Sequence, residues 1–168
     1  MKFLIHFLGD ITQPLHDESL EVGGNDIAVT WDGKSTNLHA CWDTQMVEKL
    51  AGGENSTSVL ESFAGSLITQ IDNGTYSSEK EGWISCVDVT GVESCAVGWA
   101  TDANALNCVY VLKEDESGVE LDGSYYEGAV QYLGLQIAKG GYRLGAFLNN
   151  LAAAAAKVET VVVQEVSD

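Results

Sequence analysis

The chain has 168 residues, of which 45% are hydrophobic and 20% are charged, and its formal net charge at pH 7 is −17. This length suits one compact domain, and the apolar fraction excludes a disordered chain. No apolar run approaches the roughly 18–20 residues that span a bilayer, so we expect neither an integral membrane protein nor a membrane partner.

Hydrophobic spacing predicts a first helix over residues 1–13, which stops before Pro14. Its apolar residues at helical intervals are Phe3, Leu4, Phe7, Leu8 and Ile11. His6 and Asp10 are four residues apart and therefore project from the same face of this helix. The first five residues resemble the start of a signal peptide. Because His6 and Asp10 interrupt the apolar run and no cleavage site follows, we interpret them instead as part of a core helix of a longer protein.

A small hairpin is predicted around Asp32-Gly33, because this dipeptide is a two-residue turn signal and residues 27–31 before it favour a strand. Ser35, Thr36 and Asn37 form a cluster of N-cap residues for a second helix over about 38–50, which Gly52-Gly53 closes. On this helix, His39 and Asp43 repeat the four-residue spacing of the first pair.

Three more helices are predicted over residues 57–72, 92–112 and 125–156. Gly140-Gly141 in the last helix indicates a kink or a close helix contact. Residues 113–123 are acidic and polar, which is typical of a solvated loop, and residues 157–168 form an acidic tail. The predicted fold is therefore mainly α with a small hairpin, in one domain over residues 1–156.

The histidines suggest a metal site. All three lie within the first 39 residues, and two of them have an aspartate four residues later. One such pair usually marks a helix surface, but two pairs on separate helices favour a metal. Catalytic zinc typically takes three nitrogen or oxygen ligands and keeps one position open, and His16, His39 and Asp43 provide such a set. His6 and Asp10 provide a second, incomplete set.

The charge balance supports this interpretation. Eight basic residues face 25 acidic ones, which leaves few cations to neutralise the phosphates of a nucleic acid. Bound metal ions would supply the missing positive charge, and clustered metals stabilise the attacking and leaving oxygens of a phosphoryl displacement.

Three segments carry a family resemblance. Residues 6–16 (HFLGDITQPLH), 23–25 (GGN) and 37–43 (NLHACWD) resemble the zinc-dependent single-strand-specific nucleases of fungi and plants, of the S-one and P-one type. Weaker similarity continues to about residue 151. The resemblance implies the multi-helix fold that these nucleases share with bacterial phospholipase C.

The resemblance also implies an activity and a cofactor. Such enzymes hold up to three zinc ions and cleave single-stranded DNA and RNA to 5′-phosphate products, and many also remove the 3′-phosphate of nucleotides. His6 and Asp10 are similar in position to ligands of one zinc, with Asp10 bridging to a second. His16, His39 and Asp43 match the complete ligand set of the third. No obligate protein partner is implied.

The resemblance places further ligands, the catalytic aspartate and a base-stacking aromatic residue upstream of the segment that matches this chain. No catalytic residue is therefore assigned here, and this chain is expected to be a C-terminal portion with exposed apolar surface and impaired activity. Members of this family tend to be secreted glycoproteins. A secreted protein with its signal peptide upstream is thus expected, with glycosylation acceptors at Asn55 and Asn73.

Four cysteines allow three full pairings. Cys86 and Cys95 enclose a short segment and are expected to form a local disulfide. Cys108 matches a family half-cystine whose partner lies upstream. Cys41 is either a thiolate ligand near His39 or, as we favour, a buried thiol.

Other polar and aromatic residues are expected to have structural roles. Arg143 can bind phosphate or form an ion pair, and we favour the ion pair. The four tryptophans are expected to pack in the core rather than to stack on bases; they are Trp31, Trp42, Trp83 and Trp99.

Two other functions remain open. The chain can be a noncatalytic fragment that keeps one zinc, or a lipid-directed phosphodiesterase on the same fold.

Overall fold

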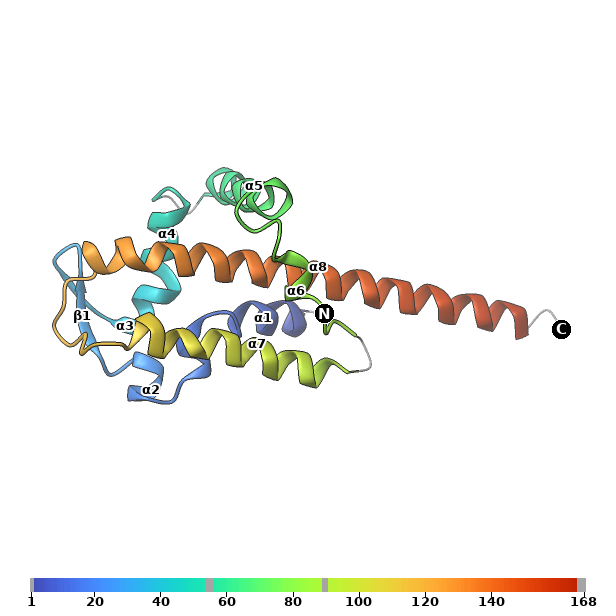
Figure 1. The fold of residues 1–168 in the computed structure, drawn as a ribbon, viewed down its shortest axis with the longest axis horizontal. Helices are drawn as coiled ribbons and strands as arrows, with labels where there is room; N and C mark the ends of the chain where they lie inside the picture. The colour runs from blue at the N-terminus through green and yellow to red at the C-terminus, as the bar shows by residue number, and fades with distance from the viewer. Residues whose placement is uncertain (1, 54–55, 89–90, 166–168) are drawn as a thin grey trace.

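The computed structural model describes residues 2–53, 56–88 and 91–165, with only the backbone described beyond residue 156. The longest element is the helix α8 (Ser124–Glu165), and the other helices are arranged around its N-terminal half (Figure 1). The helices α1 (Lys2–Asp10) and α7 (Val92–Leu106) lie on one side of α8, and α5 (Thr57–Asn73) lies on the other (Figure 1). The mainly helical prediction is confirmed, and α8 continues past the predicted end at residue 156.

The predicted hairpin is present. Strand β1 (Ala28–Trp31) pairs antiparallel with β2 (Lys34–Asn37), and Ala28 faces Asn37 at the open end. The two turn residues Asp32 and Gly33 have φ values of 51° and 69°, as a two-residue turn with positive φ at both central positions requires. Ser35 and Thr36 thus belong to β2, and Asn37 alone caps the next helix by accepting a hydrogen bond from the Ala40 N–H.

The expectation of a solvated loop over residues 113–123 was wrong in part. The backbone N–H of Thr30 donates to the Val119 carbonyl, and the N–H of Leu121 donates to the Thr30 carbonyl, both at 2.9 Å. This segment therefore pairs with the free edge of β1, and Leu121 is fully buried. The acidic composition of this segment indicated a loop, and pairing with a strand far away in the sequence leaves no local pattern that could have corrected this.

The second predicted helix is continuous in space but changes its winding. It begins as α3 (Leu38–Ala40), continues as a π-helical turn, η2 (Cys41–Gln45), and ends as α4 (Met46–Ala51). Gly52 follows with a φ of 124°, which explains the stop at the predicted position. The π turn begins two residues after His39 and contains Asp43, and π-helical turns inside α-helices are often found at functional sites.

Several short elements were not predicted. They are the 3-10 turn η1 (Pro14–Asp17), the turn α2 (Glu21–Gly24) and the helix α6 (Lys80–Trp83). The π-helical turn η3 (Asn107–Val111) continues α7 within the helix predicted over residues 92–112, and only its winding was not predicted. Gly140 marks the expected close contact, because a Cβ there would lie 3.1 Å from Thr12 Cγ2.

Three apolar clusters fill the space around α8. The largest joins the hairpin, α3, α4 and α8, the second joins α1, α7 and α8, and the third joins α5, α6 and α8. Trp42, Trp83 and Trp99 are buried in these three clusters, and Trp31 packs against the largest, as expected for structural tryptophans.

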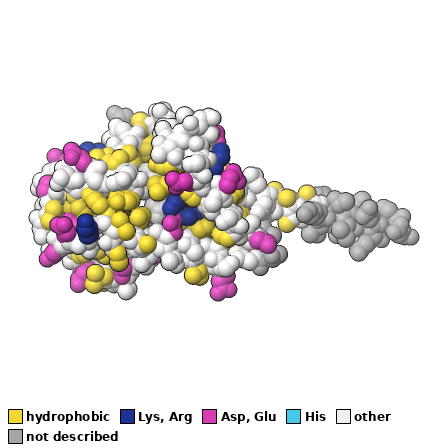
Figure 2. Space-filling model, in the orientation of Figure 1, with side chains coloured by type: hydrophobic (Ala, Val, Ile, Leu, Met, Phe, Trp, Pro, Cys, Tyr) yellow, Lys and Arg dark blue, Asp and Glu magenta, His cyan; other side chains and the backbone are white. Residues whose placement is uncertain are grey.

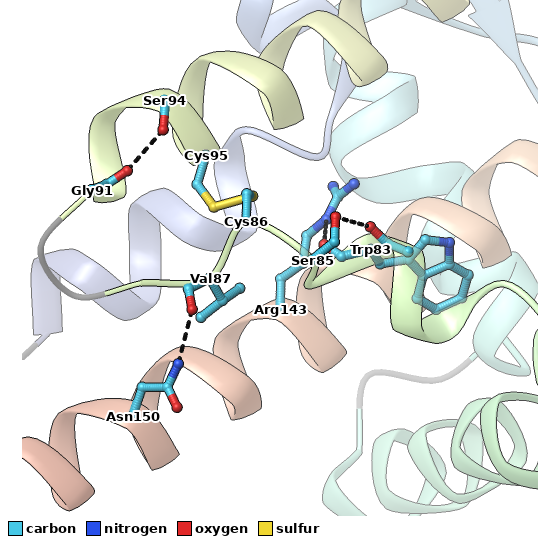
Figure 3. The surroundings of a disulfide bond; sticks show 10 residues. Trp83, Ser85, Cys86, Val87, Gly91, Ser94, Cys95, Arg143 and Asn150 are labelled. Carbon is cyan, nitrogen blue, oxygen red and sulfur yellow. Dashed lines mark hydrogen bonds between the residues drawn. A yellow bond between two sulfur atoms is a disulfide. The ribbon is translucent and has the colours of Figure 1, made fainter.

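The predicted disulfide joins Cys86 to Cys95 at the start of α7 (Figure 3). Beside it, Asn150 of α8 donates a hydrogen bond to the Val87 carbonyl at 3.0 Å. Arg143 is buried and forms an ion pair with Asp102 at 3.2 Å, which confirms the structural role that we favoured for it. The disulfide thus attaches the segment after α6 to α7, the Asn150 hydrogen bond attaches it to α8, and the Arg143–Asp102 pair joins α8 to α7.

The exposed face of α1 is apolar, as expected. Phe3 is 76% exposed and Phe7 is 56% exposed. Figure 2 shows hydrophobic side chains with acidic ones among them on the face that it draws. Among the described residues, no helix combines the length and apolar character that crossing a membrane would require.

The hydroxyl of Tyr125 provides a test of the largest cluster. It accepts a hydrogen bond from Trp42 Nε1 at 3.0 Å and donates one to the Val111 carbonyl at 3.1 Å. We expect Tyr125→Phe to lower the free energy of unfolding by about 1–3 kcal/mol, because both partners lose their hydrogen bond inside the core. Urea unfolding measures this. Tyr142→Phe, which removes an exposed hydrogen bond to Glu81, should be nearly neutral; equal losses would contradict the account.

Candidate metal centre

The turn η1 carries His16 and is held in place from two sides. Gln13 caps it, because its side-chain Oε1 accepts a hydrogen bond from the Leu15 N–H at 2.6 Å. From the α7 side, Asn104 donates to the Asp17 carbonyl at 2.7 Å and Asn107 donates to the Pro14 carbonyl at 2.8 Å. The imidazole of His16 therefore projects from a short segment whose backbone is anchored to a long helix.

A left-handed turn follows η1 and carries the backbone toward His39. Glu21, Val22, Gly23 and Gly24 have successive φ values of 48°, 56°, 64° and 79°. A Cβ at Gly23 would lie 2.6 Å from the Leu15 carbonyl oxygen, so only glycine fits there. The Gly23 carbonyl lies 2.7 Å from Nδ1 of His39.

Three side chains converge on one point. His16 Nε2 lies 3.1 Å from Asp43 Oδ1, and His39 Nε2 lies 3.2 Å from Asp43 Oδ2. The donor atoms of all three side chains lie within 4.8 Å of one another. The two imidazole rings are stacked, with centroids 5.0 Å apart. The three residues predicted as a complete ligand set are thus brought together.

The hydrogen-bond chemistry of His39 fits a cation at this point. A carbonyl oxygen only accepts, so the bond to Gly23 places a proton on His39 Nδ1. In the neutral ring, Nε2 then presents a lone pair to the Asp43 carboxylate 3.2 Å away. Two acceptors at this distance need a positive charge between or beside them, either a proton or a metal ion. Two imidazole nitrogens and a carboxylate oxygen are donors that zinc accepts.

His6 and Asp10 extend the cluster along α1. His6 Nε2 lies 3.1 Å from Asp10 Oδ2, and Asp10 Oδ1 lies 4.0 Å from His16 Nδ1. Imidazoles and carboxylates therefore alternate from His6 to His39. The His6 side chain is 67% exposed, so the incomplete pair lies at the open end of this row.

A cavity of about 630 Å³ opens beside the histidines. Its lining includes Asp10, His16 and His39, together with Val22 and the carboxylates of Asp17 and Glu18. No histidine shows on the face drawn in Figure 2. The space is large enough for a small-molecule group to approach both the complete and the incomplete ligand set.

The acid–base properties of the cluster reflect its close contacts. The hydrogen bond with Asp43 raises the pKa of His16 above its ordinary value, although partial burial opposes this. Burial alone would raise the pKa of Asp43, but hydrogen bonds from His16 and Gln13 and the charge of His39 hold it below its ordinary range. Without a metal, His16 and Asp43 thus favour an ion pair.

The cysteines do not contribute to this group. Cys41 is a free thiol in the largest apolar cluster, fully buried, and burial raises its pKa to about 11. The buried thiol is therefore the alternative that the structure supports. Cys108 is a free and exposed thiol. Of the two glycosylation candidates, Asn73 is exposed at the end of α5, and Asn55 lies outside the described residues.

Two supporting residues were missed as parts of the site. Gln13 donates from Nε2 to Asp43 Oδ1 at 2.9 Å, and Gly23 supplies the carbonyl that orients His39. Both lie within the segments that carried the family resemblance, but a side chain that acts across 30 positions of sequence leaves no spacing pattern.

Comparison with known proteins places this geometry in context. The family model described as S1/P1 Nuclease matches residues 1–153. Over 154 residues, the chain is 44% identical to Nuclease PA3 from a Penicillium species, which covers 90% of this chain and 57% of that protein. It is 46% identical over 155 residues to Nuclease S1 from Aspergillus oryzae, covering 90% and 54%. It is 31% identical over 166 residues to Endonuclease 3 from Arabidopsis thaliana, covering 94% and 53%. The chain thus spans a little more than half the length of these relatives.

The ion pair within the cluster gives a pH-dependent stability in the metal-free chain. Because the pKa of His16 is raised on folding, His16 adds to the free energy of unfolding below its ordinary pKa of 6.5. This stabilisation is lost as the pH rises through the raised pKa. Because the pKa of Asp43 is lowered on folding, Asp43 adds to the free energy of unfolding above its ordinary pKa of 3.8. This stabilisation is lost as the pH falls through the lowered pKa. With a chelator present, Asp43→Asn should therefore destabilise the chain more at about pH 5.5 than at about pH 8.

Urea unfolding at the two pH values measures this difference. Asp72→Asn is the matched control, because Asp72 pairs with Lys80 at 3.3 Å and a lysine does not titrate in this range. If Asp43→Asn lowered the free energy of unfolding equally at both pH values, or more at the higher one, the result would contradict the ion pair.

Proposed function

The chain belongs to the S1/P1 nuclease family, and from this membership we propose that it serves a zinc-dependent nuclease. The reaction is hydrolysis of phosphodiester bonds in single-stranded DNA and RNA to 5′-phosphate products, with removal of the 3′-phosphate of nucleotides as a second activity. The three most informative relatives are named as nucleases or as an endonuclease, which supports action on nucleic acid.

The single observation that carries this proposal is the convergence of three donors. His16, His39 and Asp43 have donor atoms within 4.8 Å of one another, and we assign them as the ligands of one zinc. When bound there, zinc supplies a Lewis acid and a positive charge next to a scissile phosphate. The residues of this chain contribute by orientation: Gly23 fixes the tautomer of His39, and Asp43 stays ionised beside two imidazoles.

His6 and Asp10 belong, in this proposal, to neighbouring zinc sites, with Asp10 shared between two of them. Asp10 lies between His6 and His16, at 3.1 and 4.0 Å, which supports a bridging role. Because a catalytic zinc typically has three protein ligands, this second set is incomplete within the chain. We therefore expect cleavage by the 168-residue chain alone to be slow.

The charge of the chain suits metal-assisted rather than lysine-assisted recognition of phosphates. With a net charge of −17, the surface repels a polyanion unless cations are bound. We also propose that the protein is secreted and glycosylated, which the Cys86–Cys95 disulfide and the exposed Asn73 support.

The activity is tested by incubating the chain and zinc with circular single-stranded DNA, duplex DNA or phosphatidylcholine vesicles, each with and without a chelator. The proposal expects slow, chelator-sensitive cleavage of the single-stranded DNA and little cleavage of the duplex. Zinc binding without cleavage would favour the noncatalytic single-zinc fragment, and release of a lipid headgroup would favour the lipid-directed enzyme.

The zinc assignment is tested by equilibrium dialysis followed by metal analysis. We expect His39→Ala to lose the zinc held by the complete set, because only two of its three ligands remain. His6→Ala is the matched control and should keep that zinc, since His6 is not in the three-donor group. Equal zinc content in the His39→Ala chain and the parent would refute the assignment.

A further inference from the structure

We propose that Gln13 is a positioning residue of the metal centre: its side-chain amide aligns the Asp43 carboxylate with His16. This role rests on the proposed zinc site. The evidence is that one side chain contacts two of the three elements that carry ligands, the turn η1 with His16 and the π-helical turn η2 with Asp43.

The orientation of the Gln13 amide is determined by its partners. The Leu15 N–H is a donor, so the atom 2.6 Å from it must be the Gln13 oxygen. The Gln13 nitrogen therefore faces Asp43 and donates to Oδ1 at 2.9 Å. No rotation of the amide satisfies both partners in another way.

This arrangement constrains Asp43 as well. Its Oδ1 accepts from Gln13 and also lies 3.1 Å from His16 Nε2, while Oδ2 lies 3.2 Å from His39 Nε2. The lone pair of an amide nitrogen is delocalised into the carbonyl and the group carries no net charge, so it orients a carboxylate without competing for a cation. Groups that hydrogen-bond to metal-ligating carboxylates usually affect metal affinity about 10–100-fold when they are changed.

Capping of η1 is the competing explanation for Gln13, and Gln13→Glu separates the two roles. A glutamate at this position still offers an oxygen to the Leu15 N–H, so the cap persists. Its second oxygen faces Asp43 as an acceptor with a negative charge instead of a donor. A residue that only caps η1 would therefore tolerate this change, whereas a residue that positions Asp43 would not.

The chain offers a matched control in Gln70. Its Oε1 accepts a hydrogen bond from the Thr75 N–H at 3.0 Å, just after the end of α5, and neither residue belongs to the three-donor group. Gln70→Glu thus adds the same charge and keeps the same kind of backbone contact without touching the cluster.

The experiment measures zinc affinity by chelator competition, the visible absorption spectrum of the cobalt-substituted chain, and thermal unfolding of the metal-free chain. Gln13→Glu should weaken zinc binding at least about tenfold and change the cobalt spectrum. Gln70→Glu should leave both unchanged. Gln13→Met is neutral and lacks both the amide donor and the oxygen that caps η1, and it should weaken zinc binding less than Gln13→Glu. If the glutamate variant does not fold, an unchanged zinc affinity in Gln13→Met still overturns the role.

The outcomes distinguish this role from the proposed function. A zinc affinity within twofold of the parent in a folded Gln13 variant would overturn the positioning role and leave the zinc site standing. An equal loss in Gln70→Glu would also overturn it, because the effect would then be one of overall charge. A parent chain that binds no zinc would overturn the metal site together with the role of Gln13.

Discussion

The imidazoles of His16 and His39 both face the Asp43 carboxylate, and the local backbone structure holds them in this arrangement. The contact between His39 Nδ1 and the Gly23 carbonyl commits Nε2 to Asp43. Bringing that carbonyl into place requires a left-handed turn in which Glu21 and Val22 also have positive φ. Such backbone conformations cost on the order of 1 kcal/mol or more per residue and persist where the surroundings enforce them. Here the anchored turn η1 and the buried Leu38 beside His39 provide those surroundings.

The acidic composition has a different meaning once this cluster is known. A chain with 25 acidic and eight basic residues is a poor phosphate binder by itself. In the proposed function, Asp10 and Asp43 would convert part of that excess into sites for divalent cations, whose positive charge would face the substrate. Among the described residues, the partly buried Lys139 and the buried Arg143 are both paired with Asp102. These two cations thus serve the structure, and the proposed function assigns phosphate recognition to bound metals.

The sequence predicted the helices, the hairpin turn and the five residues of the cluster, because periodicity and i, i+4 spacing are local signals. It did not predict the left-handed turn, since Glu21 and Val22 carry no preference for positive φ, nor the π turn that contains Asp43. It also missed the pairing of residues 118–121 with β1, which depends on contacts nearly 90 positions apart. The features that were not predicted therefore depend on long-range contacts or on strained backbone. The hydrogen bond from Gln13 to Asp43 is one of the long-range contacts.

X-ray absorption at the zinc edge, on the chain loaded with one equivalent of zinc, tests the central claim most directly. The account predicts a shell of nitrogen and oxygen neighbours at about 2.0–2.2 Å with the outer-shell scattering of imidazole rings. A sulfur neighbour at about 2.3 Å would place the metal on Cys41 or Cys108 instead. That result would contradict a centre built on His16, His39 and Asp43.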